Sequence, residues 1–183
     1  PMKGTAEDTE AARQELLTSQ KEIAEHATIV DLIRNDLSQV AKKVRVTNYR
    51  YLGRIKTPRG GLLQTSSEIG GWLPDGWQST LGTTIEKLLP AGSVSGAPKP
   101  ATTALIREAE GRPRGYYCGV GVYFDGKTVD SCVMIRFIEN DAEEGLLFWA
   151  GGGITARSRW EDEYAELRSK VRIPLRVEHF SLH

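Results

Sequence analysis

Residues 116–149 read YYCGVGVYFDGKTVDSCVMIRFIENDAEEGLLFW, and this stretch decides the fold class. It contains three runs rich in β-branched and aromatic residues, which predict strands at 116–124, 129–137 and 145–149. The pair Asp125-Gly126 between the first two runs is typical of a hairpin turn. Because strands joined by such short turns pair antiparallel, the stretch predicts an antiparallel sheet.

Helical segments flank these strands. From residue 9 to about residue 40, apolar side chains recur at helical spacing without Gly or Pro, which predicts one long helix or two in sequence. We also expect strands at 44–56 and 62–69, paired across a turn at 58–61, and helices at 79–89, 100–110 and 161–173. Strands cluster instead of alternating with helices, so we predict an α+β fold with an antiparallel β-sheet and outer helices.

The composition is that of one globular domain without a general nucleic-acid-binding surface. Of 183 residues, 39% are hydrophobic, and 24 Lys and Arg balance 24 Asp and Glu. Because its net charge is zero, the chain lacks the overall positive field that attracts the phosphates of nucleic acids. Apolar runs extend over only a few residues, as at 146–149, so we expect no membrane span, and we find no signal-peptide pattern.

The two cysteines point to a reducing compartment. Cys118 and Cys132 lie in apolar, strand-like segments and lack the spacing of metal ligands. Buried free thiols are favoured over a disulfide in this setting, which predicts a cytoplasmic protein.

A basic segment precedes the second expected strand. Residues 41–60 hold seven basic residues and no acidic one. One interpretation is the solvated face of an edge strand, where Lys and Arg discourage aggregation. The other is a surface that attracts an anionic ligand or partner.

Two helical segments carry carboxylates three residues apart, which places each pair on one helix face. Glu22 and Glu25 form one pair, and Glu163 and Glu166 form the other. If the two faces oppose one another, they offer the oxygen ligands that suit Mg²⁺. The alternative is structural, because Glu163 lies in the first turn of its expected helix, where acids offset the helix dipole.

Two glycine-rich segments are candidate anion sites. Residues 91–99 read AGSVSGAPK and are expected to form a loop before a helix, where backbone N–H groups can bind an anion. The spacing of the glycines and the lysine differs from that of a Walker A loop. Gly151, Gly152 and Gly153 form either a nest for a carboxylate or a bulge after a strand.

Seven blocks, in this order, resemble the chorismate-binding domain of anthranilate, isochorismate, salicylate and aminodeoxychorismate synthases. They are PMKGT (1–5), AEHATIVDLIRNDLSQV (24–40), GSVSGAPK (92–99), YYCGVGVY (116–123), MIRF (134–137), GGGITARS (151–158) and EDEYAELRSK (161–170). The resemblance extends over about residues 1–175, which is nearly the whole chain.

The resemblance implies a two-lobed α+β fold with a deep cleft, in which Mg²⁺ bridges acidic side chains and the ring carboxylate of chorismate. Carried over block by block, it assigns metal binding to Glu25, Glu163 and Glu166. It assigns substrate contacts to Tyr123, Arg136, Lys170 and the backbone around Ser95, Gly96, Gly152 and Gly153. These groups suit a dianionic substrate, which needs cations, N–H donors and a divalent ion.

The first block, PMKGT, indicates which branch of the family the chain resembles most. Anthranilate synthases and many relatives carry Ala where Lys3 stands, whereas Lys is typical of the aminodeoxychorismate synthase branch. In that branch the neutral amine is thought to attack ring carbon 2 and expel the 4-hydroxyl, before ammonia enters at carbon 4. A glutamine amidotransferase partner that supplies ammonia, within para-aminobenzoate and folate synthesis, is therefore implied. Taken alone, Lys3 is read as a surface lysine.

Three positions depart from the family pattern. Gln64 stands where a histidine is usual, which leaves a hydrogen-bonding role at this catalytic position. Val122 replaces a usual glycine, and Leu167 replaces a usual threonine.

The resemblance also implies an upstream lobe that carries an acid/base glutamate. We therefore expect residues 1–183 to be the C-terminal portion of one catalytic domain and to be inactive alone. Two alternatives stay open: another enzyme of the family, such as an anthranilate synthase, or a non-catalytic half-domain that binds a metal or a partner chain.

Overall fold

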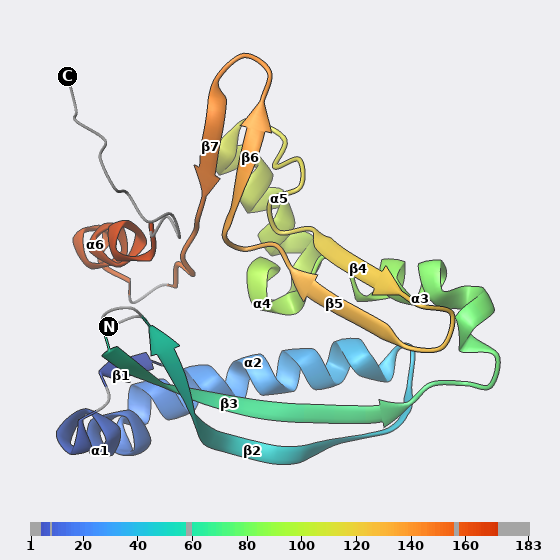
Figure 1. Ribbon diagram of the computed structural model, residues 1–183, viewed down its shortest axis with the longest axis horizontal. Helices are drawn as coiled ribbons and strands as arrows, with labels where there is room; N and C mark the ends of the chain where they lie inside the picture. The colour runs from blue at the N-terminus through green and yellow to red at the C-terminus, as the bar shows by residue number, and fades with distance from the viewer. Residues whose placement is uncertain (1–4, 8, 58–59, 156–157, 172–183) are drawn as a thin grey trace. The chain divides into compact units, whose positions relative to one another are not determined.

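The computed structural model describes residues 5–7, 9–57, 60–155 and 158–171 of the chain. Helices and antiparallel strands both occur, so the predicted α+β class is confirmed (Figure 1). The chain divides into two compact units, Pro1–Ile135 and Arg136–His183, which we describe in turn as unit 1 and unit 2.

Residues 9–40, for which the sequence predicted either one long helix or two in sequence, contain two helices. Helix α1 spans Glu10–Thr18 and helix α2 spans Gln20–Ser38. The break falls at Ser19, whose side chain accepts a hydrogen bond from the backbone N–H of Glu22 at 3.3 Å. Ser followed three residues later by Glu is a capping signature, so the second helix starts where the sequence provides its own N-cap.

A three-stranded antiparallel sheet packs with these helices. Its strands are β1 (Thr5–Glu7), β2 (Lys42–Thr57) and β3 (Gly60–Trp72), in the order β1-β3-β2. The predicted hairpin is confirmed, with Thr57 opposite Gly60. The expected turn at 58–61 was too long, because Gly60 and Gly61 already pair in the ladder.

Within the part of the chain that the structure describes, β2 lies at an edge of this sheet, which supports the first interpretation of its basic residues. Arg50 differs from the other basic residues of β2 because it is half-buried. Like Lys43, it lies at an irregular position of the strand, with φ 49°. Its guanidinium donates to the carbonyl groups of Leu16 and Leu17, which are two of the last carbonyls of α1. Arg50 therefore satisfies carbonyls that lack partners within the helix.

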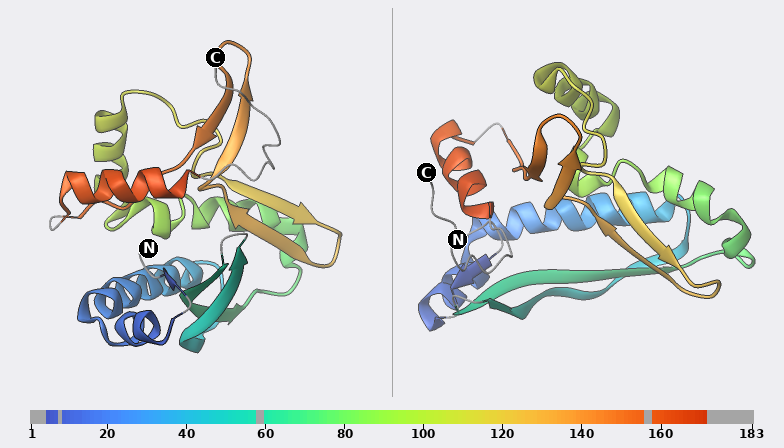
Figure 2. Two further views of the ribbon diagram at one scale, coloured as in Figure 1. Left: turned by 60° about the vertical axis from the view of Figure 1, so that its left-hand side comes forward. Right: turned by 45° about the horizontal axis from the view of Figure 1, so that its top comes forward.

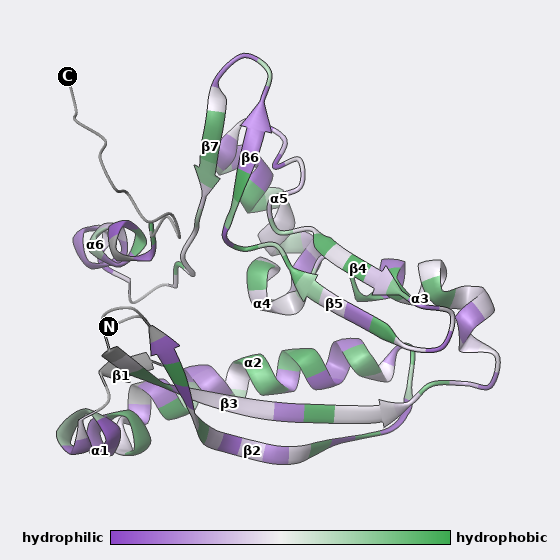
Figure 3. Cartoon of the chain, viewed as in Figure 1, coloured by the Kyte–Doolittle hydropathy of each residue, from purple (hydrophilic) through white to green (hydrophobic). Residues whose placement is uncertain are grey.

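The core of unit 1 lies between the helices and one face of the sheet. Helix α2 lies along strands β2 and β3 (Figure 1 and the right view of Figure 2), with apolar and polar residues alternating along it (Figure 3). Leu16 of α1 and Leu63 of β3 are only 5% and 7% exposed, with Ala12 and Leu52 packed against them. This small cluster fixes α1 on the sheet.

Truncation of Leu63 tests this core. We expect Leu63→Ala to lower the free energy of unfolding by about 2–5 kcal/mol, because a buried leucine leaves a cavity behind. The control Leu105→Ala removes an exposed leucine and should change it by less than about 0.5 kcal/mol. Urea unfolding followed by circular dichroism measures both, and equal effects of the two variants would contradict this assignment of the core.

After the sheet, unit 1 continues with short helices. A 3₁₀ turn at Trp77–Thr80 leads into α3 (Leu81–Leu88), and α5 spans Lys99–Glu110. The bounds of α3 and α5 differ by at most two residues from those of the helices predicted at 79–89 and 100–110. The expected loop at 91–99 instead contains one helical turn, α4 (Gly92–Ser95). The Ser95 hydroxyl donates to the Ala91 carbonyl at 3.0 Å, which helps to close this turn.

The predicted three consecutive strands are four strands in two hairpins. Strand β4 (Val120–Phe124) pairs with β5 (Val129–Val133) at the end of unit 1. Residues 116–119 were expected in the first strand but form a turn, in which the Gly119 N–H donates to the Tyr116 carbonyl and Cys118 has φ 63°. The second expected strand ends early, since Phe137 already belongs to the next hairpin.

Unit 2 consists of the hairpin β6 (Phe137–Asp141) and β7 (Gly145–Trp149) followed by α6 (Trp160–Lys170). The Trp149 indole N–H donates to Glu139 across the hairpin at 2.6 Å. Helix α6 was predicted to reach residue 173, but its last residue is Lys170. Of the helices that the described ranges contain, none combines the length and apolar character of a membrane span.

Candidate functional site

Four of the six predicted site residues of unit 2 lie on α6 or beside it. Lys170 Nζ lies 2.8 Å from Glu166 Oε1, and these side chains are only 11% and 16% exposed. The same ammonium group donates to the carbonyl of Gly151 at 3.1 Å. One cation thus joins the glycine segment to the helix that follows it.

Gly152 lies beside the same groups. A Cβ atom built on it would be 3.8 Å from both Glu163 Oε2 and Lys170 Nζ. Gly152 and Glu163 also share a cavity of about 380 Å³ with Leu167, one of the positions that depart from the family pattern. Gly153 is exposed, with open space where a Cβ would lie. Four predicted residues, namely Gly152, Glu163, Glu166 and Lys170, are therefore brought together.

The carboxylates of α6 fit Mg²⁺ in kind. Glu163 and Glu166 lie three residues apart on one helix, and carboxylate oxygens are the ligands this ion prefers. Each also contacts a protein donor: the Ser158 hydroxyl donates to Glu163 Oε1 at 2.6 Å, and Lys170 pairs with Glu166. Mg²⁺ usually takes one or two carboxylates and keeps waters or substrate oxygens, so a full protein cage is not required.

No cluster of three or more His, Cys, Asp or Glu side chains suited to a metal occurs within the described ranges of the chain. Glu161 and Asp162 precede Glu163 in the first turn of α6, where acids stabilise the helix N-terminus. The structural interpretation of these acids therefore holds for the first turn, whereas Glu166 lies beyond it and is shielded by Lys170.

In unit 1, Ser95 and Gly96 lie at the end of α4. Ser95 is buried, and Gly96 has φ 78°, a conformation that favours glycine. Ser95 also lines an open cavity of about 750 Å³, whose other lining residues come mainly from α5 and residues 111–119. The glycine segment thus lies next to a space large enough for a small molecule.

Sequence reasoning missed Arg114, Tyr117 and Cys118 in the wall of this cavity. The Arg114 guanidinium lies 5.3 Å from the centre of the Tyr117 ring and pairs with Glu110. Burial, followed by the charge of Cys118, raises the pKa of Tyr117 to about 12, and burial also raises the pKa of the Cys118 thiol. Both groups are therefore protonated at neutral pH, and the Tyr117 hydroxyl remains a hydrogen-bond donor. The sequence signal was the aromatic pair Tyr116-Tyr117, which one glycine separates from Arg114.

Glu25 and Gln64 belong to opposite sides of the unit 1 sheet. Glu25 is half-buried on α2, and the adjacent His26 reaches the sheet, with Nε2 2.6 Å from the Ser67 hydroxyl. Leu63 and Ser67 therefore point towards the helices, and side chains alternate along a strand, so Gln64 points away from them. Unit 1 does not bring Gln64 next to Glu25.

His26 makes the packing of α2 sensitive to pH. Burial is the main cause that lowers its pKa below 6.5, followed by the charge of Arg50, while Glu22 opposes the shift. The unfolded chain then takes up a proton at higher pH than the folded chain, so the stability should fall as pH decreases through 6.5. Unfolding measured between pH 7.5 and 5 should show this loss, and His26→Gln should remove it. An identical pH dependence in both proteins would contradict it.

Of the remaining predicted site residues, the two that the structure describes are exposed. Tyr123 is exposed on β4 opposite Asp130, and Arg136 is exposed at the first position of unit 2. Lys3 lies outside the described residues.

Comparison with known proteins identifies the family. The chorismate binding enzyme family matches residues 1–176, so the chain belongs to this family. Uncharacterised PabA-like proteins of Pasteurella multocida and Haemophilus influenzae are 55% and 53% identical to it over 176 residues. These alignments cover 96% of the chain but 54% and 53% of those proteins, so the chain spans about half the length of these relatives.

Relatives that carry an enzyme name are less similar to the chain. Anthranilate synthase component 1 of Archaeoglobus fulgidus is 38% identical over 182 residues, which cover 97% of this chain and 43% of that enzyme. Among solved structures, DhbC of Bacillus anthracis, assigned as a 2,3-dihydroxybenzoate-specific isochorismate synthase, superposes with a TM-score of 0.71 at 26% identity. That match covers 93% of this chain and 46% of DhbC. The predicted family and fold are thus confirmed.

Proposed function

We propose that this chain carries the chorismate site of an aminodeoxychorismate synthase, which converts chorismate and ammonia to 4-amino-4-deoxychorismate. The arrangement around α6 carries the proposal: Lys170, Glu166 and Gly152 place a shielded cation, a carboxylate and glycine backbone within one short segment. A dianionic substrate that binds together with a divalent metal requires these three kinds of group. Membership of the chorismate binding enzyme family supports it.

Substrate binding is shared among several groups. We assign the carboxylates of chorismate to Lys170, Arg136 and the backbone at Gly152–Gly153 and Ser95–Gly96, with Tyr123 as a further contact. Glu25, Glu163 and Glu166 are assigned to hold Mg²⁺, which would neutralise the ring carboxylate and support departure of the 4-hydroxyl. Gln64 is assigned a hydrogen bond to the substrate.

Lys3 distinguishes the reaction within the family. Its neutral amine forms a bond to ring carbon 2 as the 4-hydroxyl departs, and that group takes up a proton and leaves as water. Ammonia then bonds to carbon 4, and the lysine amine leaves carbon 2 with the electron pair of its bond. The sum is chorismate plus ammonia giving 4-amino-4-deoxychorismate plus water. A glutamine amidotransferase partner is proposed as the source of ammonia, in the cytoplasm.

Product identification tests this proposal. The native protein is supplied with chorismate, Mg²⁺ and excess ammonia, and the products are identified by mass spectrometry. We expect 4-amino-4-deoxychorismate. Formation of anthranilate would instead favour the second candidate, an anthranilate synthase, which the relative from Archaeoglobus fulgidus supports. Isothermal titration with Mg²⁺ and chorismate separates both enzymes from a non-catalytic half-domain, for which we expect no chorismate binding.

A further inference from the structure

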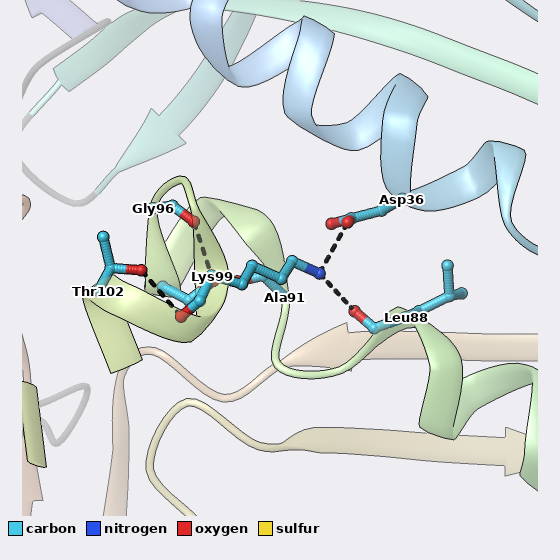
Figure 4. Close-up of polar contacts among 7 residues, drawn as sticks. Asp36, Leu88, Ala91, Gly96, Lys99 and Thr102 are labelled. Atoms are coloured by element: carbon cyan, nitrogen blue, oxygen red, sulfur yellow. Dashed lines mark hydrogen bonds and ion pairs between the residues drawn. The ribbon is translucent and has the colours of Figure 1, made fainter. Parts of the chain in front are cut away.

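Lys99 and Asp36 form a shielded ion pair in unit 1. Lys99 Nζ lies 2.7 Å from Asp36 Oδ1, and the two side chains are only 21% and 15% exposed. The same ammonium group donates to the Leu88 carbonyl at 3.3 Å (Figure 4). The pair thus connects the start of α5 to the last turns of α2 and to the end of α3.

Helix formation does not explain either charge. Lys99 is the first residue of α5, where the helix dipole disfavours a cation, and Asp36 is two residues from the end of α2, where it disfavours an anion. Each residue is therefore unfavourable in its own helix. Their contact offsets both terms, which points to a role in tertiary structure.

The pair holds the segment that carries Ser95 and Gly96. A Cβ atom at Gly92 would lie only 2.8 Å from Asp36 Oδ2, so the first residue of α4 packs directly against the carboxylate. At the other end of α4, the Gly96 N–H donates to the Gly92 carbonyl at 2.9 Å. The position of Gly96 thus depends on the position of Gly92, and that of Gly92 on Asp36.

We propose that Lys99 and Asp36 are a positioning pair that sets the Ser95–Gly96 segment in register with α2. Asp36 and Glu25 belong to the same uninterrupted helix, Gln20–Ser38. A helix keeps a fixed distance between its residues, about 1.5 Å per residue. The pair therefore links the backbone proposed to bind a substrate carboxylate to the helix that carries a proposed metal ligand. This inference rests on the proposed function and adds two residues to it.

Matched variants in the native protein test the pair. Asp36→Asn and Lys99→Met remove one charge each, and Asp31→Asn is the control. Asp31 lies on the same helix and pairs with Arg34 at 3.3 Å, but those side chains are 64% and 48% exposed. Titration calorimetry gives the Kd of Mg²⁺ alone and the Kd of chorismate at saturating Mg²⁺. Hydrogen exchange reports the protection of residues 91–99.

We expect Asp36→Asn and Lys99→Met each to weaken chorismate binding about tenfold or more, with the Kd of Mg²⁺ changed less than about twofold. The double variant should be no weaker than the worse single variant, because both remove the same contact. Exchange of residues 91–99 should be faster than in Asp31→Asn. Unchanged chorismate binding in both variants, or additive losses, would overturn the pairing role.

The two proposals fail separately. If the unsubstituted protein binds no chorismate, the proposed function fails. The exchange measurement then decides on the pair alone: faster exchange at 91–99 in Asp36→Asn supports it, and exchange equal to that of Asp31→Asn overturns it.

Discussion

Glu166→Gln is expected to weaken Mg²⁺ binding by about 100-fold and to abolish Mg²⁺-dependent turnover of chorismate, while the fold persists. Loss of a residue that merely orients a metal ligand already costs about 10–100-fold in affinity, so loss of a ligand should cost at least the upper value. The amide keeps the size of the side chain but loses the charge that faces Lys170 at 2.8 Å. Glu25→Gln on α2 should have the same effect, because both glutamates are proposed to hold one ion.

Glu161→Gln is the matched control for Glu166→Gln. Glu161 lies on the same helix and its substitution removes the same charge, but its side chain is exposed in the first turn. We expect its Mg²⁺ affinity to stay within about twofold of the unsubstituted protein, and titration calorimetry measures all three variants. Equal Mg²⁺ affinity in Glu166→Gln and the control would remove Glu166 from the proposed metal site.

Lys3→Ala is expected to lower the rate of 4-amino-4-deoxychorismate formation by about three orders of magnitude or more, as loss of a nucleophile typically does. A covalent adduct of chorismate on the peptide that contains Lys3 should also disappear. Mass spectrometry of the protein quenched during turnover measures the adduct, and product analysis measures the rate.

Two further variants give this experiment its controls. Lys127→Ala removes an exposed lysine from the turn between β4 and β5 and should leave rate and adduct unchanged. Lys3→Arg keeps a positive charge without a nucleophilic amine, so it should behave like Lys3→Ala. A normal product rate in Lys3→Ala would show that Lys3 is a surface lysine and that amination does not pass through it.

The helical parts of the fold were predictable because their signals are local. The absence of Gly and Pro between residues 9 and 40 predicted helix there, and Ser19 with Glu22 supplied the cap at which the second helix starts. The hairpin of β2 and β3 was predictable for the same reason, since a turn segment separates two runs of strand-forming residues.

The strands at 116–149 were predicted only in part. β-branched and aromatic residues mark a segment that can be extended, but pairing partners decide where a strand begins and ends. Residues 116–119 have the right composition, yet Cys118 adopts φ 63° and the segment turns. The expected strand at 129–137 is divided because its two ends pair with different partners, β4 and β7.

In the candidate site, too, local features were predictable from the sequence and contacts between distant segments were not. The seven blocks were sufficient to predict the family, which the family match confirms, because a motif preserves the order and spacing of residues along the chain. They also select Glu25, Glu163, Glu166 and Lys170 as candidates, whose roles stay predictions. They gave no sign that Lys170 pairs with Glu166 and the Gly151 carbonyl, or that Tyr117 and Arg114 line a cavity. These depend on distances between segments, which a motif does not contain.

By itself, then, the sequence determined the α+β class, the family and the approximate positions of most helices and strands. The tertiary structure alone decided which polar side chains find distant partners: Arg50 from the basic segment donates to carbonyls at the end of α1, His26 Nε2 contacts the Ser67 hydroxyl 41 residues away, and Lys99 pairs with Asp36. The physical reason is the distance along the chain over which each interaction acts. Helix propensity, capping and turn chemistry act within a few residues, whereas a side chain finds a partner far along the chain only after helices and sheet have packed.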